Sequence, residues 1–99
     1  MPRLKWSEAA LHDLVRLHDF LSSQSPEAAQ RAIQAIRQGV KALAKHPQIG
    51  RPVEEMLPEF REWIVEFGQG AYMVLYHFDG KEAVILAVRH GGEAEYRTS

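Results

Sequence analysis

The sequence predicts one α+β domain in which a short N-terminal strand and an antiparallel helix hairpin pack on a C-terminal antiparallel sheet. Two amphipathic helical patterns fill the first half of the 99 residues, and three strand-like runs separated by short turns fill the second half. Turns of a few residues cannot connect parallel neighbours, so the three C-terminal strands must pair antiparallel. A chain of this length forms one domain, residues 1–99, around one core.

Composition and charge narrow the class of function. The chain is 45% hydrophobic and 25% charged, contains no cysteine and carries a net charge of −1. No apolar run reaches the roughly 18 residues that a membrane span needs, and the N-terminus lacks the apolar segment of a secretory signal. We therefore expect a cytoplasmic protein without disulfides or membrane contact. A net charge near zero also argues mildly against binding to nucleic acid.

Residues 3–6 form a short strand candidate, and the first helix is expected to begin directly after it. Ser7 supplies a hydroxyl N-cap, and the acidic Glu8 follows in the first turn. The apolar stripe of this helix repeats at spacings of three and four residues, at Leu14, Leu17, His18 and Leu21. The polar residues 22–25 interrupt the pattern, so the helix is predicted to end around residue 22.

A second helix is predicted to follow at once, which makes the two helices an antiparallel hairpin. Ser25 is an N-cap, and Pro26 stands at the first helical position, where its missing N–H is no loss. Its buried face is predicted to consist of Ala29, Ile33, Ile36, Val40 and Leu43. Pro47 closes this helix near Lys45, because the residue before a proline is disfavoured in helical conformation.

The second half of the chain is predicted to be a loop followed by three strands. Residues 47–58 contain three prolines and one glycine, which indicates an irregular loop. Strands are expected over residues 61–67, 71–78 and 82–89. The first alternates apolar and polar residues and is predicted to lie toward an edge, whereas the second is apolar on both faces and is predicted to be central. Asp79-Gly80 between the last two strands is a typical hairpin turn.

Four motifs, in this order, carry a resemblance to a known family. They are HPQIGR at residues 46–51, LPEFRE at 57–62, GAYMVLY at 70–76 and ILAVRH at 85–90. With the order of strand, helix hairpin, proline-rich loop and three-stranded meander, they resemble the RelE/ParE superfamily of bacterial toxins, and ParE (plasmid stabilisation) more than RelE. The resemblance implies that superfamily's fold and the toxin half of a type II toxin–antitoxin pair, with a cognate antitoxin as partner.

The superfamily contains two biochemistries, and the fold alone does not choose between them. RelE-like members cleave messenger RNA on the ribosome with basic residues on the sheet and a C-terminal tyrosine or histidine, whereas ParE-like members bind DNA gyrase and block it. Against the RelE pattern, this chain has Ile64 and Glu66 where paired lysines are expected, and Met73 where an arginine is expected. The resemblance therefore implies a non-enzymatic inhibitor of DNA gyrase that arrests growth, with a ribosome-dependent messenger RNA endoribonuclease as the alternative.

The candidate functional residues follow from these two hypotheses. An endoribonuclease would have to use Glu66 as the base and His90 or Tyr96 as the acid, since the chain offers no other suitable constellation. For contact with protein partners we single out three arginines and three apolar residues of the helices: Arg51, Arg61, Arg89, Leu14, Leu21 and Ile36.

Several of these residues also have a purely structural explanation. Arg51 can hold loop carbonyl groups, and Arg61 can form a surface ion pair worth at most roughly 1 kcal/mol. Tyr96 can simply cover apolar sheet surface. His12 and His18 are six residues apart and therefore offset by more than half a turn on a helix, so we expect neither a metal site nor a cofactor. A third hypothesis is an inactive remnant that retains antitoxin binding alone.

Overall fold

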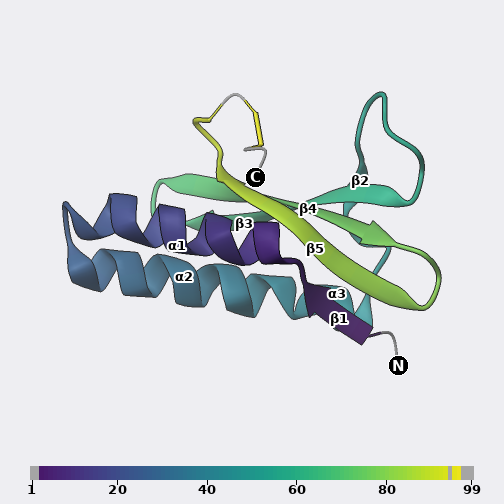
Figure 1. Cartoon of the computed structure of the whole chain (residues 1–99), viewed down its shortest axis with the longest axis horizontal. Helices are drawn as coiled ribbons and strands as arrows, with labels where there is room; N and C mark the ends of the chain where they lie inside the picture. The colour runs from purple at the N-terminus through teal and green to yellow at the C-terminus, as the bar shows by residue number, and fades with distance from the viewer. Residues whose placement is uncertain (1–2, 94, 97–99) are drawn as a thin grey trace.

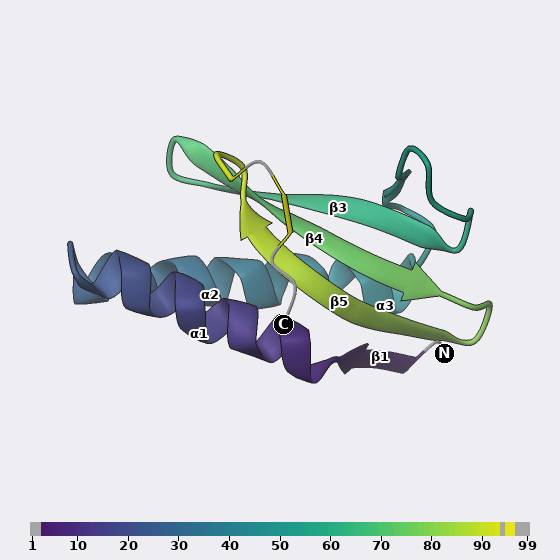
Figure 2. The same ribbon diagram turned by 45° about the horizontal axis from the view of Figure 1, so that its top comes forward.

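The computed structural model describes residues 3–93, 95 and 96 and confirms an α+β fold of two layers (Figure 1). The first half contains β1 (Arg3–Trp6), α1 (Glu8–Ser22), α2 (Pro26–Val40) and the single turn α3 (Ala42–Lys45). The second half contains β2 (Arg51–Pro52), β3 (Phe60–Phe67), β4 (Gly70–Phe78) and β5 (Glu82–His90). The two long helices cover one face of the sheet (Figure 2). No helix in the described part of the chain is long and apolar enough to cross a membrane.

The strands form one mixed sheet in the order β1-β5-β4-β3-β2. The strands β3, β4 and β5 pair antiparallel, and β4 lies at the centre, both as predicted. The prediction did not include the pairing of β1, which lies parallel to β5, from Arg3 opposite Glu82 to Trp6 opposite Ile85. A parallel pair needs a long crossover, and here the crossover is most of the chain, so no local pattern in the sequence indicates it.

The prediction of one continuous second helix as far as Lys45 is wrong, because the helix is interrupted at Lys41. α2 ends at Val40, and α3 follows as a separate turn. Lys41 donates its backbone N–H to the carbonyl of Gln38, and Ala44 donates to the carbonyl of Lys41. These bonds span three residues and form a tighter turn than the α-helical pattern, which breaks the helix before the predicted end at Lys45.

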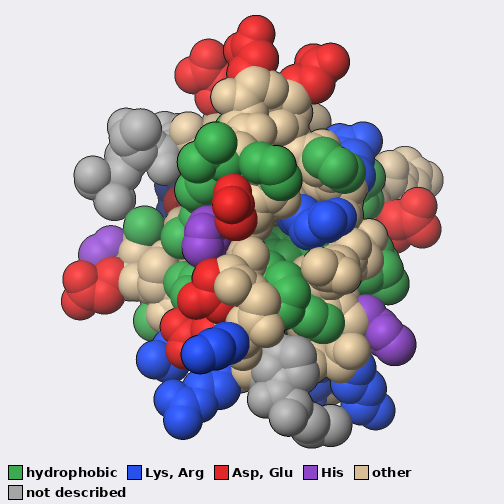
Figure 3. Space-filling view, turned by 90° about the vertical axis from the view of Figure 1, so that its right-hand side faces the viewer, with side chains coloured by type: hydrophobic (Ala, Val, Ile, Leu, Met, Phe, Trp, Pro, Cys, Tyr) green, Lys and Arg blue, Asp and Glu red, His purple; other side chains and the backbone are tan. Residues whose placement is uncertain are grey.

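The segment predicted as an irregular loop, residues 47–58, is also not wholly irregular. Arg51 pairs with Glu62 and Pro52 pairs with Arg61, which makes β2 a two-residue edge strand. Proline is tolerated there because an edge strand can turn its donor-free side to solvent. Beyond β2, residues 53–59 form a loop on the side of the sheet away from α1 and α2, and acidic and hydrophobic side chains gather over it (Figure 3).

The core lies between the helices and the sheet. Its largest fully buried side chains are Tyr76, Ile36, Leu43, Ile85, Val40, Val74 and Val88. Each large aliphatic side chain buried in this way contributes about 1.5–3 kcal/mol to folding. Trp63 on β3 faces the helices as its alternation predicts, and its indole N–H donates to the carbonyl of Gly39 on α2 at 3.0 Å.

Polar contacts fix α1 to a bulge in β5. The bulge adds one residue at Leu86 and shifts the register between β4 and β5. The hydroxyl of Ser7 caps α1 by accepting from the N–H of Ala10, and it also lies 3.3 Å from the carbonyl of Leu86. The buried Asp13 accepts from the N–H of Val88 at 2.9 Å. The bulge is therefore held in place by the first helix.

Gly50 is predicted to be irreplaceable, because it is buried against the end of β4. Its N–H donates to the hydroxyl of the fully buried Tyr76 at 2.9 Å. A Cβ at this position would lie 2.6 Å from that hydroxyl and 2.9 Å from the backbone oxygen of Glu62. We expect Gly50→Ala to lower the free energy of unfolding by about 1–3 kcal/mol, measured by urea denaturation.

Gly70→Ala is the matched control. A Cβ at Gly70 would meet only the ring tip of the exposed His90, at 3.2 Å, and that tip can move aside. We expect a change within about 0.5 kcal/mol. Equal effects of the two substitutions would contradict the packing described for Gly50.

Candidate functional site

A buried carboxylate, Glu62, lies on the sheet face that α1 and α2 do not cover, on β3 beside the edge strand β2. It faces away from the helices because it alternates with the inward Trp63 along β3. Glu62 is 8% exposed. Its Oε1 accepts from Nε and Nη2 of Arg51 at 3.1 and 2.7 Å, and its Oε2 accepts a short hydrogen bond from the hydroxyl of Tyr96. Nη2 of Arg89 lies 3.9 Å from the same Oε2. We call these four residues the Glu62 cluster.

Three different segments bring the partners of Glu62 to it. Arg51 arrives through β2, where it pairs with Glu62 across the strands. Arg89 comes from the end of β5, and its guanidinium carbon lies 5.0 Å from the centre of the Tyr96 ring. Arg89 also donates to the carbonyl of Glu93 at 2.7 Å. The cluster therefore holds both the edge strand and the segment after β5 against the sheet.

The environment keeps Glu62 ionised and Tyr96 neutral. Burial alone would raise the pKa of Glu62, but hydrogen bonds from Tyr96 and Arg51 and the charges of Arg51 and Arg89 outweigh burial and lower the pKa below its ordinary value. Burial, and then the bond to Glu62, raise the pKa of Tyr96 well above its ordinary value. Tyr96 is thus a hydrogen-bond donor that does not release its proton easily.

Glu62 is not among the site residues predicted from the sequence. Arg51, Arg89 and Tyr96 are predicted candidates, whereas Glu62 enters only as the last residue of the LPEFRE motif. The pairing of Arg51 with Glu62 depends on a strand of two residues, and the approach of Tyr96 depends on a long-range contact between β3 and a residue beyond β5. Neither leaves a periodic signal in the sequence.

The structure does not bring the predicted endoribonuclease residues together. Glu66 is exposed on the same face as Glu62. His90 lies opposite Tyr72, whose side chain is in the core, and the two rings meet edge to face at 5.4 Å between centroids, so His90 faces the helix side. Tyr96 binds Glu62 instead of either predicted partner. The bulge in β5 causes this arrangement, since it reverses the alternation after it.

Of the three arginines predicted to bind a partner, Arg51 and Arg89 belong to the Glu62 cluster. Arg61 lies elsewhere and donates to the carbonyls of Gln48 and Gly50 at 3.1 and 2.7 Å. Arg61 therefore holds loop carbonyl groups, the structural role that the sequence suggested for Arg51.

The apolar residues predicted to bind a partner are mostly internal. Leu14 is 5% exposed and Ile36 is fully buried, so both serve the core rather than an open surface. Leu21 is partly buried and packs against the same core. The apolar side chains that α1 does expose are different ones, including Leu11 and Val15. Periodicity identified the apolar stripe but not which of its members lie at its outer margin.

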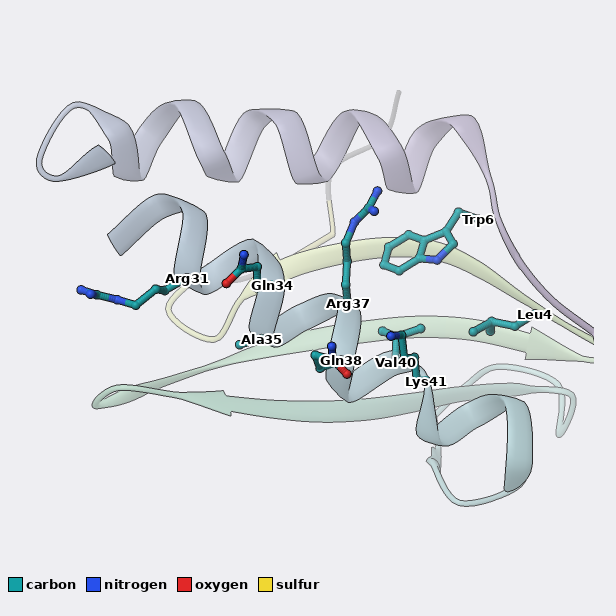
Figure 4. Close-up of a pocket in the computed structure, with 9 residues that line it drawn as sticks. All are labelled: Leu4, Trp6, Arg31, Gln34, Ala35, Arg37, Gln38, Val40 and Lys41. Atoms are coloured by element: carbon teal, nitrogen blue, oxygen red, sulfur yellow. The ribbon is translucent and has the colours of Figure 1, made fainter. Parts of the chain in front are cut away.

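Two shallow grooves border α2. The first lies between α1 and α2, and Leu11 and Val15 are among the residues that line it. The second lies between α2 and β1, and it contains Trp6 and the three cations Arg31, Arg37 and Lys41 (Figure 4). No carboxylate lines this second groove in the described part of the chain. Its side chains are suited to an acidic partner, and we call it the basic groove.

Replacement of Glu62 tests whether the cluster stabilises the fold as described. Glu62→Gln removes the charge but keeps the shape, so we expect a loss of about 1.5–3 kcal/mol in the free energy of unfolding at pH 7. A lowered pKa stabilises the folded state above the ordinary carboxyl value and ceases to do so as the pH falls through the folded value. The difference between wild type and variant should therefore shrink below about pH 4.

Glu66→Gln is the control for this experiment, because Glu66 is a carboxylate on the same face of the same strand but exposed. We expect its effect to stay within about 0.5 kcal/mol at every pH. A Glu62→Gln effect that is equally large at pH 7 and pH 3 would contradict the ionic role of Glu62.

Known proteins resemble this chain over almost its whole length. The family model described as the ParE toxin of the type II toxin–antitoxin system parDE matches residues 4–95. The relative named Toxin RelE3 from Caulobacter vibrioides is 32% identical over 93 residues, which cover 94% of this chain and 98% of the relative. Toxin RelE1 of the same organism is 32% identical over 87 residues, which cover 88% of this chain and 90% of the relative.

Solved structures agree with these relatives. A chain of the chromosomal ParDE toxin–antitoxin system from P. aeruginosa superposes with a TM-score of 0.75 at 28% identity, covering 91% of this chain and 96% of that one. A chain of the toxin–antitoxin complex RelBE2 from Mycobacterium tuberculosis shares the fold, with a TM-score of 0.64 at 24% identity and coverage of 91% and 99%. Within the RelE/ParE superfamily, this chain belongs to the ParE toxin family of type II toxin–antitoxin systems.

Proposed function

We propose that this toxin arrests growth by binding DNA gyrase, without catalysing a reaction, and that a cognate antitoxin neutralises it. The observation that carries the proposal is the Glu62 cluster. Cleavage of RNA needs positive charge free to bind the scissile phosphate. Here a buried carboxylate already binds the Arg51 guanidinium and the hydroxyl of Tyr96. Glu62 offsets the charge of one of the two arginines beside it and so weakens the attraction of the cluster for a phosphate.

A second candidate, ribosome-dependent cleavage of messenger RNA, is favoured by two observations. The two relatives described above are named RelE toxins, and Arg89 lies against the ring of Tyr96, as a phosphate-binding cation beside a tyrosine would. This activity would require Tyr96 to leave Glu62. It would also require His90 and Glu66 to act from opposite faces of the sheet. We therefore favour the binding function.

Two features on the helix side of the molecule support a cognate antitoxin as the partner. β1 is an edge strand of the sheet, and the basic groove runs beside it. A partner segment can extend the sheet at such an edge while its acidic side chains meet Arg31, Arg37 and Lys41. A solved structure that resembles this chain comes from a ParDE toxin–antitoxin system.

The gyrase proposal is tested with the purified chain, purified DNA gyrase and relaxed plasmid. We expect inhibition of supercoiling at toxin concentrations comparable to that of gyrase, and relief of the inhibition by the antitoxin. Growth arrest in cells without any inhibition of supercoiling would contradict the gyrase assignment.

Two substitutions separate binding from catalysis. We expect His90→Ala and Tyr96→Phe to arrest growth within about threefold of wild type at equal amounts of soluble protein, because neither side chain performs proton transfer in this proposal. Loss of a general acid or base from an enzyme lowers the rate by about 10²- to 10⁴-fold. A hundredfold loss of growth arrest in both variants, at equal amounts of folded protein, would favour the endoribonuclease.

A charge reversal in the basic groove tests the antitoxin surface. We expect Arg37→Glu to weaken antitoxin binding at least about tenfold, measured by calorimetry, because it places a carboxylate against an acidic partner. Lys81→Glu makes the same charge change at an exposed position in the turn between β4 and β5, and we expect it to bind within about twofold of wild type. Equal effects of the two variants would contradict this location.

A further inference from the structure

We propose that the loop between β2 and β3, residues 53–59, is the surface that contacts the cellular target, and that the matching target surface is basic with an apolar pocket. The inference rests on the proposed toxin function and specifies where that function is carried out. The loop's anchoring, its exposed apolar pair, its strained backbone and its unpaired carboxylates each support it.

The loop is anchored at both ends and turned by its own hydrogen bonds. β2 pairs with β3 at its base. Within it, the N–H of Met56 donates to the carbonyl of Val53 at 3.2 Å, and the N–H of Phe60 donates to the carbonyl of Leu57 at 3.0 Å. The loop therefore presents its side chains from a defined backbone, which lowers the entropy lost on binding.

The tip of the loop exposes two neighbouring apolar side chains. Leu57 is 67% exposed and Met56 is 40% exposed. Single exposed apolar residues are common, but these two are adjacent, lie on a projecting loop and are not part of the core cluster, so they offer a small apolar patch to a partner. Methionine and leucine in such a position fit an apolar pocket on a partner, and methionine adapts readily to its shape.

The backbone of the loop is strained at Glu55, just before this pair. Its φ angle is 67°, and within the described residues it is the one non-glycine residue with a positive φ. Glycine or asparagine adopts this conformation at lower cost, so a glutamate here carries a penalty of order 1 kcal/mol. Glutamate at this position retains a carboxylate that glycine would not supply.

The charge of the loop indicates the chemistry of its partner. Glu54, Glu55 and Glu59 are all exposed, and residues 53–59 contain no cation. None of these three carboxylates has an ion pair or a side-chain hydrogen bond within the described residues. Acidic side chains gather above hydrophobic ones over this loop at the top of Figure 3. A basic surface is the complement that would neutralise them.

The loop is also well separated from the basic groove. Figures 1 and 2 place it on the opposite side of the sheet from α1 and α2. Because the groove is cationic and the loop is anionic, one acidic segment cannot be complementary to both. We therefore assign the groove to the antitoxin and the loop to the target.

The test compares two exposed apolar residues of nearly equal exposure. Leu57→Ser changes the loop tip, and Phe20→Ser changes a side chain on α1 that is 65% exposed, against 67% for Leu57. We expect Leu57→Ser to need at least about tenfold more toxin for growth arrest, whereas Phe20→Ser stays within about twofold of wild type. Thermal unfolding and antitoxin affinity should be unchanged in both variants.

A charge pair completes the experiment. Glu54→Lys reverses one charge of the loop, and Asp19→Lys makes the same change on α1, where the aspartate side chain is 76% exposed. We expect Glu54→Lys to need at least about fivefold more toxin for growth arrest, and Asp19→Lys to show no such change. Wild-type potency of Leu57→Ser, or a loss of antitoxin affinity that matches its loss of growth arrest, would overturn the inference.

The failure of this inference is distinguishable from failure of the gyrase proposal. If wild type arrests growth without inhibiting gyrase, but Leu57→Ser no longer arrests growth, the loop is still the target surface and only the identity of the target is wrong. If wild type inhibits gyrase and Leu57→Ser inhibits it equally, the loop is excluded and the gyrase proposal stands.

Discussion

A single buried carboxylate, Glu62, organises the sheet face that α1 and α2 do not cover, which we call the helix-free face. An unpaired charge at the position of Glu62 would cost several kcal/mol, so the fold has to bring partners to it. Arg51 brings the edge strand β2, and Tyr96 brings the segment that follows β5. The same contacts occupy the hydroxyl of Tyr96 and two of the five N–H donors of Arg51. In our proposal, Glu62 therefore both stabilises this face and disfavours phosphate chemistry on it.

The remaining charge is divided between two distant surfaces. Although the net charge is only −1, the protein has a basic groove beside α2 and an acidic loop between β2 and β3. Surfaces of opposite sign favour different partners and reject wrong ones. A small toxin that must be recognised by an antitoxin and must also reach a target can use this division. Each surface would only have to bind its partner and catalyse nothing, which agrees with the proposal that the toxin acts by binding.

The elements with local signals could be predicted from the sequence, and the features that depend on distant pairing could not. The caps Ser7 and Ser25 mark the helix starts, and short turns identify the meander. The parallel pairing of β1 and the approach of Tyr96 to Glu62 join residues far apart in the chain. The bulge at Leu86 also reverses the alternation along β5, which turns Arg89 toward Glu62 and His90 toward the core side.

The most direct test of action by docking is the integrity of messenger RNA in a purified translation system that contains this protein. The system holds ribosomes, defined transcripts and no other nuclease, and the ends of the transcripts are mapped after incubation. Because the buried Glu62 disfavours phosphate binding on this face in our proposal, we expect intact transcripts at every toxin concentration. Transcripts cut at defined codon positions would show that the face processes RNA in spite of Glu62 and would contradict the account.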